Sequence, residues 1–320
     1  MRWQDVFKTN FRKVSPLLDF LEWDAPKRAL VENDASFPLN LPIRLAQKAK
    51  KNSLEDPIIQ QFIPFHKEKE SRLQLFDVLD ESAFRKAPRL LHKYPGRVLF
   101  TASHCAMHCR YCFRRDFPYE KGRVEYEEEL SYIQKDSSIQ EVILSGGDPL
   151  SLSDPVLANL LSSLDRITHL KRLRFHTRFP IGIPERICSS FLDILTKSRL
   201  KIWFVVHINH LVELDQEVEE ALNHILALKI PILTQTVLLK GVNDSLPVLQ
   251  ELFLGLVDRG FIPYYLHQTD NVPGTNHMHV PVEKGLTLLK QLEESLPGYA
   301  VPHYVQEIPG RLSKTRLHSF

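Results

Sequence analysis

The chain has 320 residues, of which 43% are hydrophobic, 9% aromatic and 25% charged. This balance is typical of a soluble globular protein and excludes collagen-like, disordered and disulfide-scaffold proteins. The formal net charge is only +2, so we expect no direct binding of nucleic acid or of a membrane through a large basic surface. Charged residues interrupt the N-terminal segment every few positions. That pattern predicts neither a signal peptide nor a membrane anchor and favours a cytoplasmic protein.

Residues 1–95 predict a small N-terminal helical cap. Trp3, Phe7 and Phe11 recur at helical spacing, and residues 43–51 carry a second short helical pattern. The charged run from His66 to Glu70 is predicted to be a solvated face.

Residues 96–297 predict an α/β domain. Helical patterns separate short β-rich segments, which begin at Arg97, Glu141, Arg172, Ile202, Pro231 and Ile262. After the second segment the spacing is about 30 residues, which indicates repeated strand–helix units with parallel pairing. A closed eight-unit barrel needs about 250 residues, so we predict a partial barrel of six units. Residues 298–320 form a C-terminal tail.

Three of the four cysteines follow the first predicted strand with the spacing C-x3-C-x2-C, at Cys105, Cys109 and Cys112. This clustering indicates a metal or redox site in a reducing compartment. Three thiolates can hold one cubane iron–sulfur cluster and leave one iron open to a ligand. The alternative is a structural zinc site completed by His104 or His108. Cys188 lies in a helical pattern and is predicted to pack as a small hydrophobic residue.

The second predicted strand ends in Gly146, Gly147 and Asp148. Two glycines allow the backbone to approach a ligand closely, and a carboxylate balances an ammonium group. The alternative is an ordinary turn or helix cap.

These motifs, in this order along a partial barrel, resemble the radical S-adenosylmethionine enzymes. Several strings are similar to lysine 2,3-aminomutases in particular: H-K-Y-P-G-R, C-R-Y-C-F-R-R, H-I-N-H, Q-T-V-L-L-K-G-V-N-D and Y-Y-L-H-Q-T-D. Within that family, the short C-terminal end and the string E-I-P-G-R-L-S-K-T look most like the branch that makes (R)-β-lysine for modification of elongation factor P. The resemblance implies a partial (β/α)6 radical SAM barrel with a helical cap and a cofactor-binding tail.

The resemblance also implies three cofactors. A [4Fe–4S] cluster would bind to the three clustered cysteines, and S-adenosyl-L-methionine would bind at Gly146, Gly147 and Asp148. Pyridoxal 5'-phosphate would be attached to Lys314, with Arg97 and Lys93 near its phosphate. The polar residues His207, Asn209, His210 and Gln235 end predicted strands at the same mouth. We assign His207 and Gln235 to the cofactor pocket, although lone histidines are as often satisfied core groups.

The implied substrate is lysine, which has a carboxylate at one end and an ammonium group at the other. Arg114 matches the family arginine for the carboxylate, and Asp270 matches a carboxylate for the ε-ammonium group. Glu307 falls where the family has a second aspartate.

The sequence thus predicts an isomerase, an intramolecular aminotransferase that converts L-α-lysine to (R)-β-lysine and needs an electron donor. Its product would supply the elongation factor P lysylation pathway. The alternatives are a lysine 2,3-aminomutase of general metabolism, a radical SAM enzyme for another amino acid, a radical enzyme without pyridoxal phosphate, and a noncatalytic iron–sulfur or zinc module.

Overall fold

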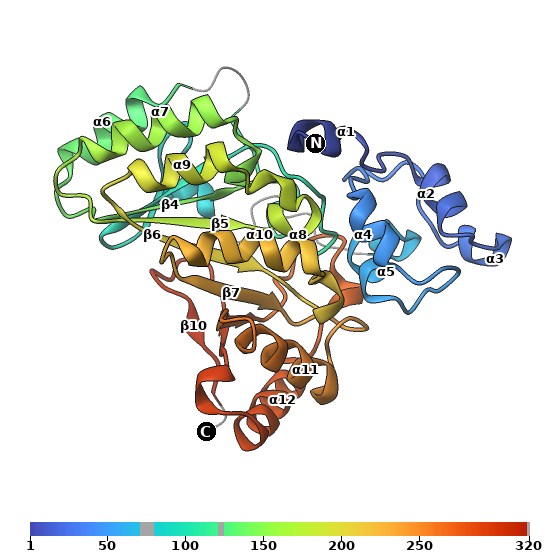
Figure 1. Cartoon of the computed structure of the whole chain (residues 1–320). Helices are drawn as coiled ribbons and strands as arrows, with labels where there is room; N and C mark the ends of the chain where they lie inside the picture. The colour runs from blue at the N-terminus through green and yellow to red at the C-terminus, as the bar shows by residue number, and fades with distance from the viewer. Residues whose placement is uncertain (71–79, 121–124, 319–320) are drawn as a thin grey trace.

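A computed structural model describes residues 1–70, 80–120 and 125–318. Its described part is organised around one ten-stranded sheet whose strands follow the order of the chain (Figure 1). The strands are β1 (Arg85–Ala87), β2 (Leu90–Tyr94), β3 (Arg97–Ala102), β4 (Glu141–Gly146), β5 (Arg172–Thr177), β6 (Lys201–His207), β7 (Ile232–Val237), β8 (Ile262–His267), β9 (His303–Gln306) and β10 (Thr315–Arg316). Strands β3 to β9 pair in parallel, and the pairs β1–β2, β2–β3 and β9–β10 are antiparallel.

A helix follows each of the strands β3 to β8, which confirms the predicted partial barrel of six β/α units. These helices are α6 (Glu127–Lys135), α7 (Asp154–Asp165), α9 (Ser189–Lys197), α10 (Gln216–Ala227), α11 (Leu246–Val257) and α12 (Val282–Ser295), with the short α8 (Phe179–Gly182) after β5. Figure 1 shows α7, α9 and α10 following one another across one face of the sheet. The short 3-10 helices are η1 (His66–Glu70), η2 (Glu81–Phe84), η3 (Pro149–Ser151), η4 (Pro184–Arg186), η5 (Leu211–Glu213), η6 (Asn276–Met278) and η7 (Gly298–Ala300).

Alternation along the strands separates an apolar outer face from a polar inner face. In β5, Leu173 and Phe175 are buried, whereas Arg174 and His176 are half-buried and point to the opposite face. The ring of Phe175 stacks at 4.9 Å on Phe204 of β6. The outer core therefore holds the helices, and the polar face is left for the interior of the barrel.

The N-terminal helices form a separate group beside one end of the barrel, coloured blue in Figure 1. They are α1 (Trp3–Lys8), α2 (Val14–Phe20), α3 (Ala25–Arg28), α4 (Ile43–Lys48) and α5 (Pro57–Phe62). Their core is continuous with that of the barrel, and Trp3 meets Phe179 edge to face at 5.4 Å. Residues 85–94, within the range expected for the cap, instead add β1 and β2 to the sheet.

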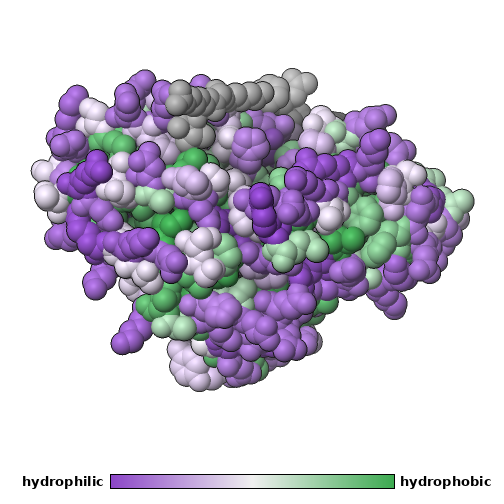
Figure 2. Space-filling model, turned by 45° about the horizontal axis from the view of Figure 1, so that its top comes forward, coloured by the Kyte–Doolittle hydropathy of each residue, from purple (hydrophilic) through white to green (hydrophobic). Residues whose placement is uncertain are grey.

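Cys188 caps the N-terminal end of α9, where it is half-buried against the core. The surface in Figure 2 is mostly hydrophilic, with hydrophobic residues in small separate patches. Among the residues that the structure describes, no helix is long and apolar enough to cross a membrane.

Candidate active site

The three clustered cysteines lie on the loop that follows β3, and the cap holds this loop from outside. Asn10 donates to the carbonyl of Ala106 at 2.7 Å, and the backbone N–H of Arg110 donates to the carbonyl of Gln61 at 2.9 Å. The fully buried Arg110 also forms an ion pair of 2.5 Å with Glu68. The cap therefore fixes the shape of the cysteine loop.

The prediction of a solvated face at 66–70 is wrong for Glu68. The side chain of Glu68 is only 8% exposed, because its carboxylate lies between Arg110 and Arg115. The two arginines that bind this carboxylate lie on a loop at least 42 residues further along the chain, so the charge pattern around Glu68 could not predict its burial.

Cys105, Cys109 and Cys112 are half-buried, and none of them forms a disulfide with another described cysteine. Burial raises the pKa of Cys105 well above its usual range and that of Cys112 to about 11. A thiol in such a place becomes a thiolate when a metal provides the opposite charge, so the donor set fits an iron–sulfur cluster. Within the described ranges, no three His, Cys, Asp or Glu side chains converge closely enough to hold a single metal ion. Ligands of a cluster bind different irons and need not converge in this way.

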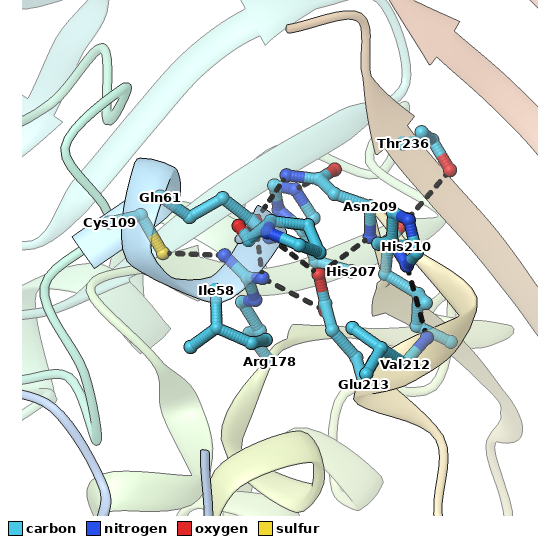
Figure 3. Close-up of polar contacts among 12 residues, drawn as sticks. Ile58, Gln61, Cys109, Arg178, His207, Asn209, His210, Val212, Glu213 and Thr236 are labelled. Carbon is cyan, nitrogen blue, oxygen red and sulfur yellow. Dashed lines mark hydrogen bonds and ion pairs between the residues drawn. The ribbon is translucent and has the colours of Figure 1, made fainter. Parts of the chain in front are cut away.

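Arg178, which follows β5, reaches the cysteine loop through a buried polar network (Figure 3). Its guanidinium donates to Cys109 Sγ at 2.9 Å, to Gln61 Oε1 at 2.8 Å and to Glu213 Oε2 at 2.9 Å, and it also donates to the hydroxyl of Tyr111. Its Nε is buried and has no partner in the part of the chain that the structure describes. That N–H is therefore a buried donor that no described residue satisfies.

Gly146 and Gly147 approach the backbone of the cysteine loop. A Cβ on Gly147 would lie 2.5 Å from the carbonyl oxygen of His104, and one on Gly146 would lie 2.8 Å from Ala102 backbone atoms. Gly146 also has a φ of +91°, which other residues rarely adopt. The glycines are thus needed for the end of β4 to pack beside β3 and the loop that follows it. This packing explains the two glycines without any contact with a ligand.

The Asp148 carboxylate is bonded within the protein. It accepts from the backbone N–H groups of Leu150, Arg178 and Phe179 and from the hydroxyl of Thr177, at 2.7–3.0 Å. Burial raises the pKa of Asp148 to about 6 in spite of these bonds. Asp148 therefore ties the ends of β4 and β5 together, and its contact with a cofactor stays a prediction.

Lys314 is carried by a hairpin made of β9 and β10. Pro309 and Gly310 occupy the centre of its turn, where Gly310 has a φ of +75° and the N–H of Arg311 donates to the carbonyl of Ile308. Gln306 is paired with Thr315, so Glu307 and Lys314 are the next residues along and face each other. Lys314 Nζ lies 2.5 Å from Glu307 Oε1 and 5.9 Å from the ring centre of Tyr265 on β8.

Glu307 also contacts two residues of β2, which lies next to the edge strand β1 on the far side of the sheet. Lys93 of β2 lies 3.1 Å from Glu307 Oε2, and Tyr94 donates to Oε1 at 2.7 Å. Burial alone would raise the pKa of Glu307, but Lys314, Tyr94 and Lys93 outweigh it and hold the pKa at about 2. The predicted phosphate residue Lys93 and the predicted substrate residue Glu307 are thus partners in this structure. Arg97 lies over the ring of Tyr94 at 5.0 Å.

Arg114 and Asp270 lie beside this group. Arg114 forms a bidentate ion pair with Glu81, with N–O distances of 2.6 and 2.7 Å, and both side chains are buried. Burial raises the pKa of Asp270 to about 7, while the nearby charge of Lys314 opposes that change. The inner face also carries His176, whose Nε2 is buried without a partner among the described residues and whose pKa is lowered by burial and by Arg174. The cations Arg97 and Lys314 fit an anionic cofactor, and Arg114 and Asp270 fit a substrate that carries a carboxylate and an ammonium group.

The remaining predicted pocket residues are His207, Asn209, His210 and Gln235. His207 and Asn209 belong to the buried polar network around Arg178. His207 Nε2 lies 3.2 Å from the Tyr111 hydroxyl and 3.0 Å from Asn209 Oδ1, and burial lowers the pKa of His207 to about 3. Gln235 lies on the neighbouring strand β7, directly opposite His207 of β6. His210 caps η5 by accepting from the N–H of Val212.

Comparisons with known proteins agree with this geometry. Residues 95–178, which include the three cysteines, match the family model of a 4Fe-4S single cluster domain. The L-lysine 2,3-aminomutase of Haemophilus influenzae is 40% identical over 284 residues, which are 87% of this chain and 84% of that protein. The chain belongs to the L-lysine 2,3-aminomutase family. Another member, the L-lysine 2,3-aminomutase of Escherichia coli, is 36% identical over 94% of this chain and 90% of that protein.

Membership of the L-lysine 2,3-aminomutase family confirms the recognition made from the motifs. Among solved structures, a radical SAM methyltransferase from Sphaerobacter thermophilus is 17% identical, with a TM-score of 0.48 over 68% of each chain.

Sequence reasoning missed several residues that this member of the aminomutase family places around the site. Six such residues were not identified from the sequence, namely Gln61, Glu81, Tyr94, His176, Arg178 and Glu213. A signal existed for Arg178, because it directly follows the carboxyl end of a strand, where ligands bind in parallel α/β folds. Gln61 and Glu81 lie outside the six units, and their sequence surroundings carry no such signal.

Proposed function

We propose that the protein converts L-α-lysine to (R)-β-lysine by radical 1,2-amino migration, using an iron–sulfur cluster, S-adenosylmethionine and pyridoxal phosphate. The observation that carries this proposal is the position of Lys314. The tail hairpin brings its amine to Glu307 and beside Asp270, at the barrel mouth that also contains Arg114. Relatives named L-lysine 2,3-aminomutase, which match along most of this chain, support the same reaction.

Lys314, Lys93 and Arg97 would hold pyridoxal phosphate, whose π-system supplies a way for nitrogen to move between neighbouring carbons. The side chain of Lys314 is 22% exposed, so it is not sealed within the protein. Glu307 binds both lysine ammonium groups and so offsets the repulsion between them. Transfer of the Lys314 proton to a neighbouring carboxylate would free the amine for attachment.

Arg114 and Asp270 would bind the two ends of the substrate. Arg114 would bind a carboxylate through the guanidinium N–H groups that Glu81 does not occupy, and Asp270 would accept from an ammonium group once it is ionised. Glu81 already occupies the Nε and Nη2 donors of Arg114, which leaves Nη1, 3.4 Å from Ser145 Oγ, for the substrate. The pair therefore fixes the direction from which a substrate carboxylate can approach.

Cys105, Cys109 and Cys112 would hold the cluster, which with S-adenosylmethionine supplies the radical that removes hydrogen from the substrate. The glycines at the end of β4 leave the cofactor room beside the cysteine loop, and the buried Nε of Arg178 offers it a donor. The cap, which is hydrogen-bonded to the cysteine loop, would limit access of water and oxygen to the cluster. An external electron donor must deliver the electron.

We further propose that the β-lysine serves modification of elongation factor P. The string E-I-P-G-R-L-S-K-T, from Glu307 to Thr315, connects β9 to β10 in the tail hairpin and supports this assignment by its resemblance to that branch. Free-lysine metabolism is the second candidate.

The test is incubation of reconstituted, anaerobic protein with labelled L-α-lysine, S-adenosylmethionine, a reductant and pyridoxal phosphate, followed by chiral product analysis. We expect (R)-β-lysine from the unchanged protein and none from Lys314→Arg, which keeps the positive charge but cannot attach the cofactor. Product formation without pyridoxal phosphate, or undiminished formation by Lys314→Arg, would overturn the proposal. Absence of β-lysine while another amino acid is converted would reassign the substrate.

A further inference from the structure

Arg178 is a buried cation that touches a predicted cluster ligand, and nothing in the proposed reaction requires a base or an acid at its position. Its side chain is 6% exposed and ends at Cys109 Sγ, with an N–S distance of 2.9 Å. Figure 3 shows the guanidinium lying between the cysteine and the carboxylate of Glu213. Burying an arginine costs several kcal/mol unless its donors are satisfied, so this contact reflects a specific arrangement.

The arrangement holds the guanidinium in one orientation. Glu213, which is fully buried, accepts from Arg178 at 2.9 Å, from Gln61 at 3.0 Å and from the backbone N–H of Asn209 at 3.3 Å. Gln61 in turn accepts from Arg178 at 2.8 Å and from the Asn209 side chain at 2.9 Å. The ring of Phe62 covers the guanidinium at 5.0 Å. The orientation of the N–H that donates to Cys109 is therefore set by residues of α5, of η5 and of the segment that follows β6, and does not depend on the cysteine.

The positive charge of Arg178 lies closer to Cys109 Sγ than the negative charge of Glu213 does. Arg178 is in hydrogen-bond contact with Cys109, and Glu213 contacts the guanidinium through its other terminal nitrogen. Because the cation is the nearer charge, the pair presents its positive end to the cysteine. Reduction adds one negative charge to a cluster, and a nearby cation or an N–H···S hydrogen bond stabilises that charge.

We infer that Arg178 is a positioning residue that raises the reduction potential of the cluster through its hydrogen bond to Cys109, and that Glu213 limits this effect by partial neutralisation. The inference rests on the assignment of the cluster to Cys105, Cys109 and Cys112 in the proposed function. The inference adds residues that contact a cluster ligand indirectly. One of them is Gln61 of the cap, which accepts from Arg178 and so links the cysteine loop to the N-terminal helices.

The test is a redox titration of the reconstituted cluster, followed by electron paramagnetic resonance, in the full-length protein. In Arg178→Met the reduced-to-oxidised ratio at a fixed potential should fall by about tenfold, a shift of about 59 mV for one electron. In Glu213→Gln, which preserves the shape of the side chain, the ratio should rise. Arg178→Lys, which keeps the charge but not the planar fork, should lie between Arg178→Met and the unchanged protein.

Arg186→Met is the matched control, because Arg186 is an equally buried arginine that bonds to the carbonyls of Leu150 and Leu152 instead of a cysteine. Its cluster potential should equal that of the unchanged protein. Shifts of Arg178→Met and Glu213→Gln in the same direction, or no shift in either, would overturn the inference. If Arg178→Met does not retain iron, the other two variants decide. A higher reduced-to-oxidised ratio in Glu213→Gln together with a lower ratio in Arg178→Lys supports the inference, and any other result contradicts it. Iron and sulfide content, measured first, separates the two proposals: an unchanged protein without a cluster refutes the cysteine assignment, not the role of Arg178.

Discussion

Lys314 Nζ lies 2.5 Å from Glu307 Oε1, and the second oxygen of the same carboxylate lies 3.1 Å from Lys93 Nζ. One carboxylate thus joins the tail hairpin to β2, which lies next to the opposite edge strand β1 of the described sheet. We expected Glu307 to bind the ammonium group of the substrate, and that role stays a prediction. The contacts in the structure give Glu307 a role in holding the two lysines proposed to bind pyridoxal phosphate.

Replacement of Glu307 by glutamine should destabilise the protein in a pH-dependent way. The pKa of Glu307 is held at about 2, below the ordinary 4.5, so its stabilising contribution is complete above pH 4.5 and disappears as the pH falls toward 2. We expect Glu307→Gln to lower the free energy of unfolding by on the order of 3 kcal/mol at pH 7. Urea unfolding at pH 7 and pH 3.5 should show a smaller difference from the unchanged protein at the lower pH. An equal or larger difference at pH 3.5 would contradict this explanation.

Binding of lysine should depend on the ionisation of Asp270. Its pKa is raised to about 7 by burial, and only the ionised carboxylate attracts the ε-ammonium group of lysine. The KM for lysine should therefore fall as the pH rises from about 6 to about 8. In Asp270→Asn the KM should be about 100-fold higher and should not change across that range. The exposed Asp258, replaced in the same way, serves as the control. The same pH slope in Asp270→Asn would exclude Asp270 as its source.

An added methyl group at Gly147 should displace the cysteine loop. The new Cβ would lie 2.5 Å from the carbonyl oxygen of His104, one residue before Cys105. We expect Gly147→Ala to retain less than half of the iron per chain after reconstitution. Gly298→Ala is the matched control, because its Cβ would meet no atom within 4 Å. Equal iron content in the two variants would show that the close packing of Gly147 does not support the cluster loop.

The barrel could be predicted because its signals are local. Each of the six units has its own strand and helix pattern, and the cysteine spacing lies within eight residues of one loop. Burial alternation along β5 also follows from a period of two. The strands β1 and β2 were missed because they are short and lie outside the repeating units, where β1 pairs with β2 and β2 pairs with β3 in an antiparallel manner.

The partners of the site residues could not be predicted because they depend on contacts between distant segments. Glu68 and Arg110 are 42 residues apart, Gln61 and Arg178 are 117 apart, and Lys93 and Glu307 are 214 apart. A sequence shows that such residues are charged or polar, but only the fold shows which of them meet. Asp148 illustrates the same limit, since its bonds to the Thr177–Phe179 segment occupy the carboxylate assigned to a cofactor.

The central claim is that Lys314 carries pyridoxal phosphate within the barrel mouth. Incubation of the reconstituted protein with pyridoxal phosphate, reduction with borohydride and peptide mass analysis measure this directly. Our account predicts one major adduct, on the peptide that contains Lys314, and its loss in Lys314→Arg with no loss in Lys284→Arg, where a surface lysine pairs with Asp244. An adduct on other lysines only, or the absence of any adduct, would contradict it.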